Sequence, residues 1–280
     1  MKKSILDLYK MKELGEKVAL ITAYDAPTAF LAEQAGIDVL LMGDSVGMCV
    51  YGYAGTNQMT MPIQLAHTNA VRRGAPNTFL IGDMPFLSYQ ISCEDAVRNA
   101  GAFIQQASAD AIKLEGGRVV TKQIRAISDA GIVVFGHVGL TPQSSGLLGG
   151  FKAQGLTAKS ATEIIMDAEA VEEAGAKFLL VEAVAAEVTE RIHERLSIPV
   201  YGIGAGPYTD GQLMIVSDLL GVFEAFAPKF VKRYANLATT MKEAFQKYRE
   251  EVKGGIFPDV GHAYAMRSGE LEKLRAELGK

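Results

Sequence analysis

The chain has 280 residues, of which 49% are hydrophobic and 21% are charged, and its formal net charge is −4. This composition excludes an intrinsically disordered chain, and the scattered Lys and Arg residues argue against a nucleic-acid partner. The apolar runs are far shorter than a membrane-spanning helix, and the start of the chain lacks a signal-peptide core. The two cysteines, Cys49 and Cys93, form no CxxC pair. These features predict a soluble cytoplasmic protein that binds no membrane.

Short apolar runs alternate along the chain with longer amphipathic segments. The short runs are rich in Val, Ile and Leu, as in parallel strands that are buried on both faces. In chain order they are Val18–Ala23, Val39–Met42, Thr78–Gly82, Ala111–Glu115, Val133–His137, Phe178–Glu182 and Val200–Gly204. The segments between them have helical periodicity: Pro27–Ala35, Pro62–Arg73, Glu94–Ala107, Thr121–Ala130, Ala161–Ala174 and Ala186–Leu196.

This alternation predicts an α/β fold, a closed (β/α)8 TIM barrel that forms a single domain over residues 1–280. The position of the eighth strand stays open, because Gln212–Ser217 fits a strand or a helix. An open doubly wound sheet is the alternative, but Pro207 stands where the last Gly of a dinucleotide-binding GxGxxG motif belongs. Residues 229–280 form a predicted helical extension, with one helix over Lys229–Tyr248 and a last charged helix within Gly254–Lys280.

Ionisable residues follow five of the predicted strands at the point where each strand ends. They are Asp44, Asp83, Lys113 with Glu115, His137 and Glu182. In a parallel barrel the carboxyl ends of all strands meet at one face, where the active site lies. We therefore expect these side chains to converge on one site.

Three carboxylates from adjacent strands are typical of a site for a hard cation such as Mg²⁺, which prefers oxygen ligands. Asp44 and Asp83 are the best candidates for direct ligands, and Glu115 could bind directly or through water. The alternative is that each acid accepts hydrogen bonds from turn amides, which is a common role of Asp.

Lys113 and Glu115 alternate with one residue between them, so both side chains point to the same face of the strand. Lys113 could bind a substrate oxygen, or form an ion pair with Glu115 or Asp83. The apolar neighbours of Glu182 favour a role as proton acceptor, and a salt bridge is the alternative. His137 could hold a substrate carboxylate or an oxyanion, or serve as a structural histidine.

The segment Gly43–Gly47 fits the G-x-S-x-G motif of a hydrolase nucleophile, with Ser45 at its centre. That motif needs a helix directly after the serine, whereas residues 48–57 have no helical period and are predicted to form a loop. The hydrolase interpretation is therefore disfavoured, and the loop is interpreted as a mobile cover over the site.

From Lys17 to Gly261 the chain resembles the ketopantoate hydroxymethyltransferase family of the phosphoenolpyruvate/pyruvate barrel superfamily. Several motifs in order carry the resemblance: Thr22–Asp25, Gly43–Gly47, Gly82–Phe86, Ala111–Gly117, His137–Gln143, Gly150–Gly155, Glu182–Ala183, Gly202–Gly206 and Asp210–Gln212. For this sequence it implies Mg²⁺ ligands at Asp44, Asp83 and Glu115, substrate contacts at Asp44, Ser45, Asp83 and Lys113, and a proton acceptor at Glu182.

The resemblance also implies a reaction. A hydroxymethyl group would pass from 5,10-methylenetetrahydrofolate to 3-methyl-2-oxobutanoate through an enolate that Mg²⁺ stabilises. The product would be 2-dehydropantoate, in the first committed step of pantothenate and coenzyme A biosynthesis. The partners would be the 2-oxo acid and the folate, and the assembly a homo-oligomer such as a decamer.

Two rival functions remain open. One is a Mg²⁺-dependent lyase that cleaves 2-oxo or 2-hydroxy acids, although neither Cys49 nor Cys93 has the neighbours of the catalytic loop cysteine found in some of those enzymes. The other is a barrel without catalytic activity that binds metabolites or partner chains.

Overall fold

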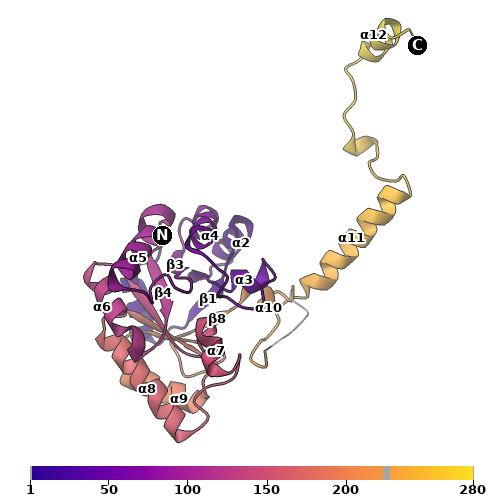
Figure 1. Cartoon of the computed structure of the whole chain (residues 1–280). Helices are drawn as coiled ribbons and strands as arrows, with labels where there is room; N and C mark the ends of the chain where they lie inside the picture. Colours follow the sequence, from indigo (N-terminus) through magenta and orange to yellow (C-terminus); the bar gives the residue numbers. More distant parts are fainter. Residues whose placement is uncertain (1, 223–227, 280) are drawn as a thin grey trace.

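Eight parallel strands close into a barrel in the computed structural model, which describes residues 2–222 and 228–279 (Figure 1). The strands are β1 Val18–Thr22, β2 Val39–Met42, β3 Phe79–Asp83, β4 Ala111–Glu115, β5 Val134–Gly139, β6 Phe178–Glu182, β7 Val200–Ile203 and β8 Gly211–Met214. Each strand pairs with the next in sequence order, and β8 pairs with β1. The predicted TIM barrel is confirmed and the open sheet is wrong. The eighth strand takes the first three residues of the ambiguous segment, and the last two, Val216 and Ser217, begin helix α10.

Helices surround the barrel, and two more at the C-terminus extend away from it (Figure 1). They are α1 Ile5–Leu14, α2 Ala26–Gln34, α3 Val46–Cys49, α4 Met61–Gly74, α5 Cys93–Ala107, α6 Thr121–Asp129, α7 Ser145–Leu148, α8 Ala158–Glu173, α9 Ala186–Arg195, α10 Val216–Leu219, α11 Leu237–Lys253 and α12 Glu270–Glu277. Short 3-10 turns lie at Arg118–Val120, Pro142–Ser144 and Val260–His262. The six helices predicted between strands correspond to α2, α4, α5, α6, α8 and α9. None of the described helices is long and apolar enough to cross a bilayer.

Large side chains fill the interior of the barrel. The ring of Phe135 packs 5.6 Å from that of Phe178 and 5.7 Å from that of Tyr201, measured between ring centroids. Tyr9 of α1 packs 5.8 Å from Phe178, and Leu8 of the same helix is buried in this cluster. Because these residues fill the barrel, as in other TIM barrels, chemistry is confined to the end where the strands finish.

The C-terminal extension differs from its prediction. Residues 228–236 are not helical, and α11 begins at Leu237 and ends at Lys253. The start is set by the barrel, because the backbone N–H groups of Tyr234 and Leu237 donate to carbonyls at the end of α10, those of Leu219 and Leu220. Helices α11 and α12 extend away from the barrel (Figure 1). Residues 1, 223–227 and 280 of the predicted domain lie outside the described residues.

Candidate active site

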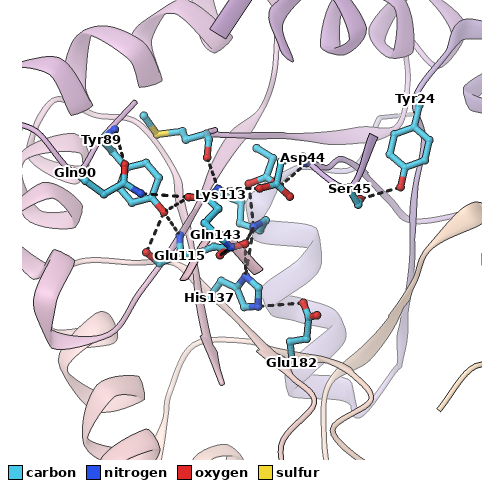
Figure 2. Close-up of polar contacts among 12 residues, drawn as sticks. Tyr24, Asp44, Ser45, Tyr89, Gln90, Lys113, Glu115, His137, Gln143 and Glu182 are labelled. Atoms are coloured by element: carbon cyan, nitrogen blue, oxygen red, sulfur yellow. Dashed lines mark hydrogen bonds and ion pairs between the residues drawn. The ribbon is translucent and has the colours of Figure 1, made fainter. Parts of the chain in front are cut away.

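All of the ionisable residues predicted at the strand ends line one cavity of about 1170 Å³ at the carboxyl ends of the strands. Asp44 follows β2, Asp83 ends β3, and Glu182 ends β6. Figure 2 shows Asp44, Lys113, Glu115 and His137 gathered together with Glu182 beside His137, whereas Ser45, which also lines the cavity, points to Tyr24. The predicted convergence is confirmed.

Lys113 occupies the centre of this cluster. Its Nζ lies 2.9 Å from Asp83 Oδ1 and 3.2 Å from Glu115 Oε1, so the buried ion pair foreseen as an alternative is present. Burial by itself would lower the pKa of Lys113, but Asp83, Glu115 and Asp44 raise it well above its usual range. A lysine that stays protonated is a point charge for a substrate oxygen and a poor nucleophile.

Asp44 and Asp83 are both buried and lie side by side. The backbone N–H of Asp44 donates to Asp83 Oδ2 at 2.9 Å. Burial raises the pKa of both carboxyls, and for Asp44 the nearby Asp83 and Glu115 raise it further. Lys113 opposes this rise, but removal from water and like-charge repulsion still disfavour the ionised form of both carboxyls, so the negative charge of this pair is only partly balanced.

Glu115 differs from the two aspartates because both of its oxygens have cationic or N–H partners. Oε1 lies near Lys113 and His137, and Oε2 accepts from the backbone N–H of Gln143 at 3.0 Å. Burial would raise the pKa of Glu115, but Lys113 and hydrogen bonds from His137 and Gln143 lower it to about 2. This carboxyl is therefore ionised across the physiological pH range.

His137 bridges two carboxylates. Its Nδ1 lies 3.4 Å from Glu115 Oε1 and its Nε2 lies 3.3 Å from Glu182 Oε2. Burial and Lys113, whose Nζ lies 3.3 Å from His137 Nδ1, would lower the pKa of His137, but these two glutamates raise it to about 9 and so favour the protonated ring. The side chain of Glu182 is 17% exposed, against 2% for Glu115, and it is the more accessible of the two from the cavity.

The backbone around Glu182 is tightly constrained. Ala183 adopts a left-handed conformation with φ of 49°, which is uncommon for a residue other than glycine. Gly139 of the neighbouring strand has φ of 93°, and a Cβ there would lie 2.4 Å from the carbonyl oxygen of Glu182. The glycine therefore lets the two backbones approach at the point where the glutamate enters the cavity.

The prediction of a loop after Ser45 is wrong in its first residues, because the one-turn helix α3 follows this serine directly. The surroundings of Ser45 still differ from those of a hydrolase nucleophile. Its backbone is relaxed, with φ of −54° and ψ of −16°, and its Oγ hydrogen-bonds Tyr24 Oη at 2.8 Å. No histidine contacts this hydroxyl among the described hydrogen bonds, so the hydrolase interpretation has no base to support it.

Two residues at the centre of the site, Gln143 and Tyr89, are not among the predicted site residues. The Gln143 side chain donates to Asp44 Oδ2, and the Tyr89 hydroxyl donates to Gln143 Oε1 (Figure 2). Gln143 closes the motif that begins at His137, which is a signal that could have found it. Tyr89 lies in a loop after β3 and carries no such signal.

In the part of the chain that the structure describes, no three His, Cys, Asp or Glu side chains form a ready-made metal centre. Lys113 lies between Asp83 and Glu115, which keeps the three predicted ligands from closing around one point. Mg²⁺, however, usually takes only one or two protein carboxylates, with water and substrate completing its shell. Asp44 and Asp83, two buried neighbouring carboxylates whose negative charge Lys113 balances only in part, fit that requirement.

A closed TIM barrel with buried ionisable groups at the carboxyl ends of its strands defines an enzyme of the (β/α)8 class. Solved structures share this fold. A phosphonopyruvate hydrolase in complex with oxalate and Mg²⁺ has a TM-score of 0.62 and 16% identity, covering 100% of this chain and 97% of that one. A 2,3-dimethylmalate lyase, a member of the PEP mutase/isocitrate lyase superfamily, has a TM-score of 0.61 and 17% identity, covering 99% of both chains.

The chain belongs to the ketopantoate hydroxymethyltransferase family, whose model matches residues 2–260. It is 60% identical over 279 residues to the 3-methyl-2-oxobutanoate hydroxymethyltransferase of Alkaliphilus metalliredigens, covering 99% of both chains. It is 48% identical over 272 residues to the enzyme of that name from Bacillus subtilis, covering 97% of this chain and 98% of that one. The predicted resemblance is confirmed, and the protein is an enzyme of the transferase class.

Proposed function

We propose that this enzyme transfers a hydroxymethyl group from 5,10-methylenetetrahydrofolate to 3-methyl-2-oxobutanoate. The product is 2-dehydropantoate, and the step is the first committed one of pantothenate and coenzyme A biosynthesis. The names of the relatives support the reaction. The observation that carries the proposal is that an accessible carboxylate, Glu182, faces the same cavity as the anchors for a 2-oxo acid, Asp44, Asp83 and Lys113.

The 2-oxo acid binds at the end of the cavity formed by β2, β3 and β4. Asp44 and Asp83 would hold Mg²⁺, and Glu115 would contribute through water, since both of its oxygens already have partners. When bound, Mg²⁺ supplies a Lewis acid for the carboxylate and keto oxygens of the substrate. Lys113 adds a fixed positive charge, and the hydroxyl of Ser45, held by Tyr24, donates to a substrate oxygen.

Glu182 removes the C3 proton of the 2-oxo acid. His137 Nε2 lies 3.3 Å from Glu182 Oε2, and this ion-pair contact orients the carboxylate and leaves Oε1 for the proton. The electron pair left at C3 forms the enolate, which attacks the one-carbon unit of the folate. Water supplies the hydroxyl group, and tetrahydrofolate leaves.

A turnover assay with single components omitted tests this function. The complete mixture of enzyme, 3-methyl-2-oxobutanoate, 5,10-methylenetetrahydrofolate and Mg²⁺ is expected to form 2-dehydropantoate, and omission of either the folate or Mg²⁺ is expected to stop it. Consumption of 2-oxo or 2-hydroxy acids without folate would support the lyase instead. Calorimetric binding of the 2-oxo acid without turnover would support a barrel that only binds.

We also propose that the enzyme is a cytoplasmic homo-oligomer such as a decamer. The C-terminal extension supports association, because large apolar side chains on and after α11 are exposed, among them Phe245, Tyr248 and Ile256. The two cysteines are free thiols, which suits a reducing compartment. Light scattering of the purified chain tests the assembly, and a monomer would contradict it.

A further inference from the structure

The side chain of Gln143 uses its whole hydrogen-bonding capacity inside the active site. The residue lies in the 3-10 turn after β5 and is 3% exposed. Its Nε2 donates to Asp44 Oδ2 and to the carbonyl oxygen of Met84, both at 2.9 Å. Its Oε1 accepts from Tyr89 Oη at 2.7 Å and from Gln90 Nε2 at 3.2 Å. An amide has two donors and two acceptor positions, so all four are used.

These partners allow the amide one orientation. A flipped amide would place Oε1 against two acceptors, the Met84 carbonyl and the Asp44 carboxylate, and would place Nε2 against a donor from Gln90. Tyr89 enforces the choice, since its Oη accepts from the backbone N–H of Glu115 at 3.0 Å. The single hydroxyl proton is then directed to Gln143 Oε1 at 2.7 Å, which is closer than the Glu115 carbonyl at 3.1 Å.

Gln143 thereby holds two of the proposed metal-site carboxylates from different strands. The side chain holds Asp44 after β2, and the backbone N–H holds Glu115 Oε2 at the end of β4 at 3.0 Å. Among the described hydrogen bonds, the carboxylate of Asp44 accepts through Oδ2, and its Oδ1 accepts none. Figure 2 shows the Gln143 amide between these two acids, with Tyr89 and Gln90 to its left in this view.

We propose that Gln143 is a positioning residue for the metal site, whose amide, fixed by the Tyr89 hydroxyl, holds Asp44 through Oδ2 and leaves Oδ1 for the divalent cation. The proposal rests on the proposed function, because it assumes that Asp44 binds Mg²⁺. Partners of this kind, one contact away from a metal, typically change metal affinity by about 10- to 100-fold when they are removed.

Gln143→Met tests the proposal, because it keeps the length of the side chain and removes the amide. The backbone contact to Glu115 remains. Mn²⁺ replaces Mg²⁺ as the probe, and its dissociation constant is measured by electron paramagnetic resonance of the free ion, which needs no turnover. The constant is expected to rise about tenfold or more. Turnover is expected to fall at low Mg²⁺ and to return to within a few-fold of wild type at saturating Mg²⁺.

Gln64→Met is the matched control. Gln64 is a buried glutamine of α4 whose amide has no hydrogen-bond partner among the described residues, and it does not line the cavity. Mn²⁺ affinity is expected to stay at the wild-type value in this variant. Tyr89→Phe is a second test, which can still be carried out if Gln143→Met folds poorly. It keeps the Gln143 amide but removes the hydroxyl that fixes it, so a smaller rise in the Mn²⁺ dissociation constant is expected.

Two outcomes overturn the positioning role. One is a folded Gln143→Met enzyme that binds Mn²⁺ within twofold of wild type. The other is a loss of turnover that saturating Mg²⁺ does not restore. Failure of the proposed metal site itself has a different signature, because the wild-type enzyme would then bind no Mn²⁺ at all.

Discussion

The two ends of the barrel both bury aspartates, but they surround them differently. At the end where strands begin, Asp210 accepts from Lys12 Nζ at 2.8 Å, His193 Nε2 at 2.9 Å and the backbone N–H of Val200 at 2.8 Å. These contacts join α1, α9, β7 and the start of β8. At the end where strands finish, Asp44 instead meets the carboxylates of Asp83 and Glu115.

The same contrast extends to a second aspartate at each end. Asp110, before β4, pairs with Lys2 and Arg72 and accepts from the backbone N–H of Leu80. Asp83, at the other end, shares Lys113 with Glu115. The cost of burying a carboxylate is offset when its partners replace water and remains when they do not. We therefore infer that the carboxylates where strands begin stabilise the fold. Those where strands finish, at the mouth of the barrel, are kept for function.

The largest effect is expected at the mouth, from Glu182→Gln. Removal of the proton acceptor should slow exchange of the C3 proton of 3-methyl-2-oxobutanoate with deuterated solvent by about 10²- to 10⁴-fold. Proton NMR in D₂O measures this exchange. Thermal unfolding should barely change, because glutamine can still accept from His137. Glu187→Gln changes an exposed glutamate on α9 and is the control. Exchange at the wild-type rate in Glu182→Gln would contradict the assignment of Glu182 as proton acceptor.

Asp210→Asn is the counterpart at the opposite end. The amide of the new asparagine is neutral, so Lys12 and His193 lose the negative charge that they face. Its NH₂ group also presents a donor to one of these two donors. We expect the free energy of unfolding to fall by about 1–3 kcal/mol, less than for breaking a fully buried ion pair, because Lys12 is partly exposed. Urea denaturation measures the loss. Turnover of the folded enzyme should remain near wild type, and Asp129→Asn on the exposed end of α6 is the control.

The stability difference between wild type and Asp210→Asn should depend on pH. Burial would raise the pKa of Asp210, but hydrogen bonds from Lys12, Val200 and His193 lower it below its ordinary value. A carboxyl with a lowered pKa stabilises the fold above its unfolded pKa of about 3.9 and loses that contribution as pH falls through the folded value. Urea denaturation should therefore give a constant difference above about pH 5 and a shrinking one below about pH 4. A difference that grows in acid would contradict this.

Much of the site could be predicted because parallel strands leave no freedom in where their carboxyl ends meet. A polar residue after a buried strand, such as Asp44, Asp83 or Glu182, must reach the mouth once the barrel is inferred. The pairing of Lys113 with Asp83 and Glu115 was foreseen as an alternative for the same reason.

What could not be predicted depends on loops and on contacts between distant parts of the chain. Gln143 reaches Asp44 across 99 residues, and Tyr89 reaches Gln143 across 54. No local period encodes either contact. The helix after Ser45 is a single turn, too short for periodicity to reveal. The start of α11 is set by carbonyls of α10 rather than by its own sequence.

The free energy of unfolding of metal-free Asp44→Asn at pH 7 tests this division of the barrel most directly. Asparagine keeps an oxygen for Gln143 Nε2 and removes a carboxyl from the crowded mouth. Urea denaturation in EDTA should show a variant at least as stable as wild type, with a gain of up to about 1 kcal/mol, although its turnover is lost. A loss of stability as large as that of Asp210→Asn would contradict the account, because the mouth would then be as stabilising as the other end.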